Sequence, residues 1–265
     1  MQIFLTIDLD LFPLIAYIRY WLEQEDQYSL QAPFVSKLYT DLKKDLQRNL
    51  SQTDPFAEQR VLLSGDKEKI NIRDFGAGSK KLKSAHRTTS DIYRYSTTGR
   101  KFSTIYNFLC RQTPAAHVLE LGTCLGINTL YLAKATEGNL YSFEGSPSLV
   151  SKAENINCFD HVSFVSGDIS ETLPVHLKTH IPVDFALLDA THTYEATLKY
   201  VEMLLPHLHD DSILVIDDIH WSRGMQKAWE EINSLKEVSF SIDFYECGVL
   251  LFKKGMQKEN RILSI

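Results

Sequence analysis

The feature that most constrains this chain is a regular alternation of short apolar runs and helical stretches over residues 101–254. Such an alternation is typical of a parallel β-sheet that is covered by helices on both faces. The runs that predict strands lie at 117–121, 140–143, 162–165, 183–188 and 212–216. The stretches that predict helices lie at 101–112, 126–135, 147–157, 194–208 and 223–235.

The end of the chain follows a different pattern. Two further apolar runs, 238–244 and 249–253, are separated by only four residues. A connection this short cannot hold a helical crossover, so the two runs predict an antiparallel hairpin. The expected fold is therefore α/β, with a seven-stranded, mostly parallel sheet and a C-terminal antiparallel hairpin. A dinucleotide-binding fold usually ends in a parallel sixth strand instead.

Residues 1–100 follow a different sequence pattern. They are polar and helix-prone and show no strand–helix alternation. We expect an N-terminal helical extension or lid over 1–100 that covers the acceptor side of a core domain over 101–265. The overall charge is mildly acidic, with a formal net charge of −6. A dedicated nucleic-acid binder would need a basic stripe, so no nucleic-acid partner is expected.

The first 22 residues are apolar, but Asp8, Asp10 and Arg19 interrupt them. These charges argue against a signal peptide and against a membrane span. The segment instead predicts a helix over about 10–24, with Asp10 as N-cap and Pro13 in its first turn. The side chains expected to be buried on it are Leu14, Ile15, Ile18, Trp21 and Leu22.

Basic side chains gather in one stretch, where they form either a solvated face or a site for an anionic substrate. They are Lys80, Lys81, Lys83, His86, Arg87, Arg94, Arg100 and Lys101. The cysteines form no Cys-x-x-Cys pair, so neither a zinc cluster nor a disulfide framework is expected. We predict reduced thiols in a cytoplasmic protein at Cys110, Cys124, Cys158 and Cys247.

A glycine turn at 122–126 follows the first predicted strand, with Glu120 just before it. Glycine tolerates backbone angles that side chains forbid and lets a ligand approach the main chain closely. Because open α/β sheets bind ligands at the carboxyl ends of their strands, polar groups at later strand ends predict a cofactor site. Such carboxylates follow the next three strands, at Glu144, Asp168 and Asp189.

This pattern resembles class I S-adenosylmethionine-dependent methyltransferases over about residues 101–254. Within that class it looks most like the metal-dependent small-molecule O-methyltransferases related to the catechol and caffeoyl-CoA enzymes. The resemblance implies a Rossmann-like fold in which Glu120 and the turn hold the methionine part of the cofactor. Glu144 would hold its ribose, and Asp168 would lie by the adenine. The implied cofactor-binding residues are Glu120, Gly122, Thr123, Gly126, Glu144, Gly145, Gly167, Asp168 and Asp189.

Two other glycine patterns fit less well. A dinucleotide-binding turn has the form Gly-x-Gly-x-x-Gly, whereas Thr123 and Cys124 follow Gly122 here, so the middle glycine is missing. Residues 70–79 also combine a strand-like run, an acid and glycines, but no apolar helix follows. We interpret 70–79 as a loop that could act as a lid over the substrate.

Acidic and imidazole side chains follow the fourth and fifth predicted strands. In the metal-dependent relatives a cation bound by carboxylates lowers the pKa of an acceptor hydroxyl. The resemblance implies Asp189, Asp217 and Asp218 as ligands of Mg²⁺ or a similar divalent cation, although the third position is often Asn in the relatives. The alternative is that these aspartates cap helices or are solvated. The predicted catalytic residues are Asp189, with His192 or His220 as a general base.

Together these features predict S-adenosylmethionine-dependent methyl transfer to a small-molecule acceptor at a hydroxyl oxygen, with or without a divalent metal. Two alternatives stay open, namely a metal-free N-methyltransferase and a cofactor-binding protein without catalysis. Apolar N-terminal helices often pair such enzymes, so a homodimer is compatible with the sequence. No membrane partner is expected.

Overall fold

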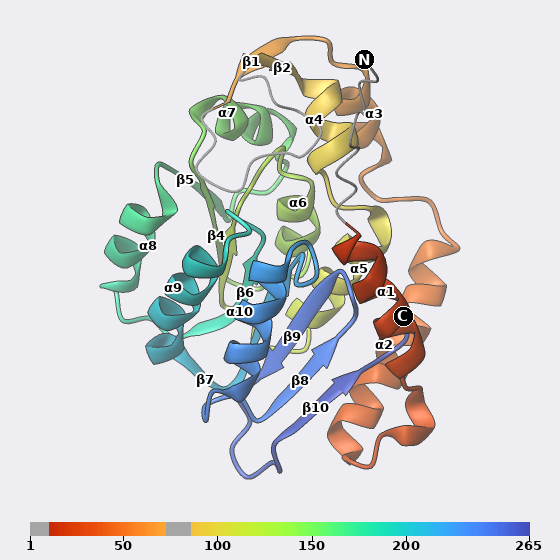
Figure 1. Cartoon of the computed structure of the whole chain (residues 1–265). Coiled ribbons are helices and arrows are strands. Elements are labelled where there is room, and N and C mark those ends of the chain that lie inside the picture. Colours follow the sequence, from red (N-terminus) through yellow and green to blue (C-terminus); the bar gives the residue numbers. More distant parts are fainter. Residues whose placement is uncertain (1–10, 73–85) are drawn as a thin grey trace, which may run out of the picture.

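The computed structural model describes residues 11–72 and 86–265 (Figure 1). Within these residues helices flank an eight-stranded sheet of order β10-β8-β9-β7-β6-β3-β4-β5. The strands are β3 (His117–Leu121), β4 (Asn139–Glu144), β5 (Val162–Ser166), β6 (Val183–Leu188), β7 (Leu208–Asp217), β8 (Phe240–Asp243), β9 (Cys247–Leu251) and β10 (Glu259–Ile262). The helices that precede or connect them are α5 (Arg100–Cys110), α6 (Ile127–Ala133), α7 (Pro147–Ile156), α8 (Ile169–Leu177), α9 (Tyr194–Leu204) and α10 (Arg223–Ser234).

The predicted mostly parallel sheet and its closing hairpin are confirmed. β5, β4, β3, β6 and β7 run parallel, and β9 is antiparallel to both β7 and β8. The predicted number of seven strands is wrong, because β10 pairs in parallel with β8 at the edge of the sheet. The sequence of β10, Glu-Asn-Arg-Ile, is polar and only partly buried, so it lacks the apolar run that marks the other strands.

Most element boundaries lie close to their predicted positions, and β3 and β6 match theirs. α9 ends four residues before the predicted position because Pro206 in the 3-10 turn Leu205–His207 cannot continue an α-helix. α8 is absent from the predicted helices, since Pro174 inside it disfavours a helical interpretation. Tertiary packing overrides that local preference, because Leu173 and Leu177 of α8 are buried in a core.

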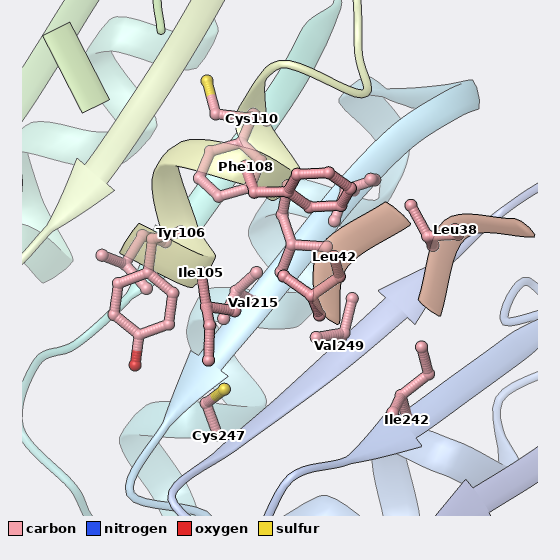
Figure 2. Packing of buried hydrophobic residues seen from close by; sticks show 14 of the residues in the cluster. Leu38, Leu42, Ile105, Tyr106, Phe108, Cys110, Val215, Ile242, Cys247 and Val249 are labelled. Atoms are coloured by element: carbon pink, nitrogen blue, oxygen red, sulfur yellow. The ribbon is translucent and has the colours of Figure 1, made fainter. Parts of the chain in front are cut away.

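Apolar side chains alternate between the two faces of the sheet and build one core on each. Val118 and Leu187 belong to the core under α2 (Pro33–Leu50) and α5. Their neighbours Leu119 and Leu188 belong to the core under α8, α9 and α10. Figure 2 shows the first core, where side chains of α2 and α5 pack over strands β7 and β9. This packing buries β3 and β6 completely, and so fixes the carboxyl ends where ligands bind.

The N-terminal region is mainly helical and includes a short two-stranded ribbon. Its elements are α1 (Phe12–Glu23), a 3-10 turn (Gln27–Ser29), α2, α3 (Ala57–Gly65), β1 (Lys69–Asn71), β2 (His86–Thr88) and α4 (Thr89–Ser96). β1 and β2 pair antiparallel, so the start of the expected 70–79 loop is a strand. Residues 73–79 of that loop, and the expected N-cap Asp10, lie outside the described residues. No helix in the ranges 11–72 and 86–265 is long and apolar enough to cross a membrane.

The predicted burial of the apolar side chains of α1 is wrong. The helix packs against the protein through Ala16 and Tyr20, and the Tyr20 hydroxyl donates to the Leu263 carbonyl oxygen at 2.8 Å. The hydrophobic stripe therefore exists, but it faces away from the core of its own chain. The exposed side chains include Leu14, Ile15, Ile18, Trp21 at 61% and Leu22 at 70%.

Candidate functional site

A cavity of about 450 Å³ opens at the carboxyl ends of β3, β4, β6 and β7. It gathers most of the residues that the sequence singles out, although these come from separate parts of the chain. The predicted site residues along its wall are Gly122, Glu144, Gly145, Asp168, Asp189, His192, Asp217 and Asp218. Thr123 is buried beneath the wall, where its hydroxyl shares a hydrogen bond of 2.5 Å with Ser142.

The turn after β3 needs glycine at two positions. Gly122 has a φ of +105°, and a Cβ there would lie 2.0 Å from the carbonyl oxygen of Asp189. Gly126 has a φ of +81°, and a Cβ there would lie 2.8 Å from the Cβ of Ala153 in α7. Both positions combine a left-handed backbone with close approach of another element, which only glycine accommodates without strain.

Glu120 is fully buried at the end of β3. Its Oε2 accepts hydrogen bonds of 2.5 Å from Thr129 and from Ser142, while its Oε1 has no partner in the described part of the chain. Burial, and secondarily the charge of Glu144, raises the pKa of Glu120 to about 7. Glu120 does not line the cavity itself, whereas Gly122, two residues further on, does. An unpartnered buried oxygen fits a ligand that brings a donor, such as an ammonium group. Thr129 and Ser142 are additional site residues that the sequence pattern alone does not single out.

Glu144 ends β4 on the cavity wall and is held there by two backbone groups. Its Oε2 accepts from the amide of Cys124, and its Oε1 accepts from the amide of Ser146, both at 2.9 Å. The first bond ties the carboxylate to the glycine turn, and the second ties it to the start of α7. A carboxylate fixed in this way offers acceptor positions to vicinal hydroxyl groups of a ligand.

Gly167 and Asp168 follow β5 on the same edge. Gly167 has a φ of +136°, and its amide donates to the carbonyl oxygen of Glu144 at 2.9 Å. The side chain of Asp168 accepts from the amide of Ser170 at 2.8 Å and so caps α8. Asp168 therefore caps a helix and lines the cavity as well.

Asp189 and Asp217 form an acidic pair at the ends of β6 and β7. Burial, followed by the charges of Asp217 and Asp218, raises the pKa of Asp189 well above its usual range. Burial and the charge of Asp218 raise the pKa of Asp217 to about 8. Tyr106 of α5 donates to Asp217 at 2.6 Å, and Asn128 of α6 donates to Asp189 at 3.3 Å. These neutral donors stabilise the pair from the side of the core.

The three predicted metal ligands share the cavity without forming a metal site. Among residues 11–72 and 86–265, no group of three or more His, Cys, Asp or Glu side chains is arranged to hold a metal ion. Tyr106 already donates to Asp217, and the side chain of Asp218 is 41% exposed on a residue with a left-handed φ of +56°. The metal role of these three aspartates therefore stays a prediction.

The structure separates the two candidate histidines. His192 lines the cavity, with its Nε2 3.6 Å from Asp189 Oδ1 and 3.9 Å from Asp218 Oδ2. His220 instead lies in a second cavity of about 230 Å³, where its Nε2 is 2.8 Å from Asp243 Oδ2 and its ring stacks on Tyr245. The turn after β7 directs His220 away from the carboxylates, so sequence proximity to Asp218 is misleading.

The N-terminal region supplies the opposite wall of the cavity through α4 and the segment 95–99. Of the gathered basic residues, Arg87 and Arg94 line this wall. Arg100 and Lys101 have structural roles instead, because they donate to the carbonyl oxygens of Asn49 and Ile265, respectively. Trp221 and Glu246 also line the cavity. Only the tertiary structure shows which of these residues reach the site.

Comparisons with known proteins find a match over part of the chain. Residues 119–219 match a family model described as a methyltransferase domain. The sequence has no significant match among curated proteins. The matched segment begins in β3 and extends two residues beyond β7, so it contains every candidate cofactor residue from Gly122 to Asp189.

Solved structures with the same fold share little sequence with this chain. The cofactor-bound Rv0187 from MTB is 17% identical, with a TM-score of 0.56 over 81% of this chain and 97% of its own. The SAH-bound methyltransferase PaMTH1 of Podospora anserina is 15% identical, with a TM-score of 0.51 over 60% and 80%. The O-methyltransferase TomG of Streptomyces achromogenes, in complex with SAM, is 18% identical, with a TM-score of 0.51 over 60% and 82%. These structures confirm the predicted fold, and residues 119–219 match a methyltransferase domain, as the sequence resemblance implies.

Proposed function

We propose that this chain, which carries a methyltransferase domain on a class I methyltransferase fold, transfers a methyl group from S-adenosylmethionine to a small molecule. The observation that carries the proposal is a cradle made of the glycine turn and Glu144 on the wall of one cavity, with Glu120 buried two residues before Gly122. In this proposal residues 101–265 are the cofactor-binding core, and the N-terminal region covers the acceptor.

The chemistry of the cradle suits this cofactor. The unpartnered Oε1 of Glu120 would accept from the ammonium of the methionine part, and the turn at Gly122 would let that part approach the backbone. Glu144 would accept from the ribose hydroxyls, and the Gly167–Asp168 turn would border the adenine. Bound S-adenosylmethionine supplies a methyl group that is already activated on a sulfonium, so the protein has to align the acceptor and remove its proton.

His192 is the proton acceptor in this proposal. It is the histidine that shares the cavity with Asp189, and a neutral imidazole has a ring nitrogen that can accept a proton. Asp218, 3.9 Å away, would stabilise the positive charge that His192 gains from an acceptor hydroxyl. His220 has no part in the reaction, because it lies in the other cavity. A metal step is not proposed, since the aspartates are not arranged as a metal site.

A hydroxyl acceptor is supported by similarity to TomG, whose structure is described as an O-methyltransferase. A second candidate is an amine acceptor. The acidic lining near His192, formed by Asp217, Asp218 and Glu246, would attract a cationic amine. We also propose that two copies pair through the exposed face of α1.

The first experiment measures ligand binding. A thermal-shift panel of S-adenosylmethionine, S-adenosylhomocysteine, NAD and NADP, each with and without Mg²⁺, should show stabilisation by the two sulfur ligands alone. A ligand at 100 times its Kd stabilises a fold by about 2.7 kcal/mol, which such a panel resolves. Glu144→Ala should weaken S-adenosylhomocysteine binding at least about 10-fold, since hydrogen bonds to a charged group are worth about 1.5–3 kcal/mol. Unchanged affinity in this variant would remove the ribose assignment, and stabilisation by NAD would reject the cofactor.

The second experiment tests the reaction. Labelled S-adenosylmethionine is incubated with dihydroxyphenyl acceptors and with primary amines, each with Mg²⁺ or with a chelator. We expect transfer to hydroxyl acceptors that a chelator leaves unchanged. Transfer to amines alone would favour the second candidate, and transfer that needs Mg²⁺ would reject the metal-free site. Tight binding of S-adenosylhomocysteine without any transfer would indicate a cofactor-binding protein that lacks catalysis.

A further inference from the structure

Charge is distributed unevenly around the cavity. Among the described residues that line it, the only guanidinium groups are those of Arg87 in β2 and Arg94 in α4. An anionic group of a ligand would be repelled by most of the wall and attracted only to this side. The carboxylates that line the cavity are Glu144, Asp168, Asp189, Asp217, Asp218 and Glu246.

The segment 94–99, which comprises the end of α4 and the link to α5, is tied to the cofactor cradle. The thiol of Cys124 in the glycine turn donates to the carbonyl oxygen of Ser96 at 3.6 Å. Asn128 of α6 donates to the hydroxyl of Thr98 at 2.8 Å, and Arg60 of α3 donates to its carbonyl oxygen at 3.3 Å. The segment therefore holds a fixed position opposite the turn that approaches the methionine part.

The same segment carries two features that suit an anion. The buried hydroxyl of Thr97, on the cavity wall, has no hydrogen-bond partner within the described residues. Two residues further on, Gly99 is the N-cap of the 11-residue helix α5 and also lines the cavity. Because glycine has no side chain, no N-cap side chain accepts from the first amides of α5. The free amides and the dipole at the start of a helix favour negative charge. Arg94, exposed and stacked 5.2 Å from the Tyr95 ring centroid, adds a full positive charge.

We propose that Arg94 and Thr97 bind the carboxylate of the amino-acid part of the cofactor, an inference that rests on the proposed function. This part of the cofactor is a zwitterion, and its ammonium would face the unpartnered oxygen of Glu120. Its carboxylate then needs a partner away from the acidic lining, and the segment 94–99 provides it. Arg94 can donate two parallel hydrogen bonds to a carboxylate, and Thr97 can donate a third.

The test compares two probes that differ only in the carboxylate. S-adenosylhomocysteine and its decarboxylated analogue are titrated calorimetrically into the full chain, its Arg94→Gln and Arg94→Lys variants, and Thr97→Val. Arg48→Gln is the matched control, because Arg48 is an exposed arginine on α2 outside the cavity.

Arg94→Gln should weaken S-adenosylhomocysteine binding by about 10- to 100-fold, the range expected when a charged hydrogen-bonding partner is lost. Arg94→Lys should recover part of the affinity, and Thr97→Val should lose about 3- to 10-fold. The decarboxylated analogue should bind every variant equally, and Arg48→Gln should match the parent chain.

An Arg94→Gln variant that binds S-adenosylhomocysteine as the parent does would overturn the assignment and leave the arginine to an anionic acceptor. Equal losses for both probes would overturn it too, because the effect would then not depend on the carboxylate. Failure of the proposed function gives a different result, since the parent chain would then bind neither probe.

Discussion

At the turn after β3, there is no room for a Cβ atom at two positions, so only glycine fits there. Gly122 and Gly126 are needed because a neighbouring element occupies the place of their missing side chains. Glu120 is held by two hydroxyls that come from α6 and β4. The sequence indicates the glycines and the acid, but it does not show that Asp189 or Ala153 crowds the glycines.

Gly122→Ala tests this crowding. Its Cβ would meet the carbonyl oxygen of Asp189, so β6 would have to shift, and we expect a loss of at least about 2 kcal/mol in the free energy of unfolding. Gly255→Ala is the control, because Gly255 has a similar φ of +78° with no described atom within 4 Å of its Cβ position. Urea denaturation of both variants measures the difference. Equal losses would mean that backbone strain alone, and not contact with β6, requires the glycine.

At the scale of elements, the apolar periodicity of α1 predicts its helix correctly but predicts the burial of its apolar side chains wrongly. The predicted apolar stripe exists, yet the helix rests on Ala16 and Tyr20 and presents the stripe outward. Contiguous exposed apolar surface of this kind marks an interaction site in soluble proteins. The same stripe on a second copy could pack against it, which suits the self-complementary contact of a two-fold dimer.

Charged substitutions on this face test the pairing. Trp21→Glu with Leu22→Glu should convert a dimer to a monomer in light scattering after size exclusion. The monomer should stay folded, because both side chains are exposed in the single chain. Tyr28→Glu, which places one negative charge at an exposed site outside α1, should leave the dimer intact. A parent chain that is monomeric at all concentrations would contradict the proposed pairing.

At the scale of the whole molecule, buried carboxylates couple folding to pH. The pKa of Glu120 is raised from 4.5 to about 7 in the folded protein, chiefly by burial. Between these values the folded chain keeps a proton that the unfolded chain has lost. Its contribution to stability is therefore present at low pH, falls as the pH rises through this window, and is lost above about pH 7.

We expect the proton on Glu120 to contribute about 3 kcal/mol to the free energy of unfolding at low pH, and this contribution to be lost above about pH 7. Glu120→Gln should flatten the decline of the unfolding free energy between about pH 4.5 and pH 7, as measured by urea denaturation of the ligand-free protein. Glu202→Gln, on an exposed position of α9, should leave the pH profile unchanged. If Glu120→Gln and the parent show the same profile, Glu120 is ionised in the folded state and the burial argument fails.

The sequence by itself determined the layered α/β core, the terminal hairpin and the glycine turn. These features are local, because the spacing of apolar side chains within a short segment predicts a strand or a helix, and a glycine in a turn predicts a special backbone conformation. β10 escaped prediction because its pairing with β8, and not its polar sequence, makes it a strand.

Only the tertiary structure decided which side chains meet. It brought Arg94 and Thr97 to the cavity, joined Asp217 to Tyr106 across 111 positions, and turned His220 toward Asp243. It also left the stripe of α1 exposed. Each of these outcomes depends on packing between elements that are distant in the chain, where the burial of a whole surface outweighs the preference of any short segment.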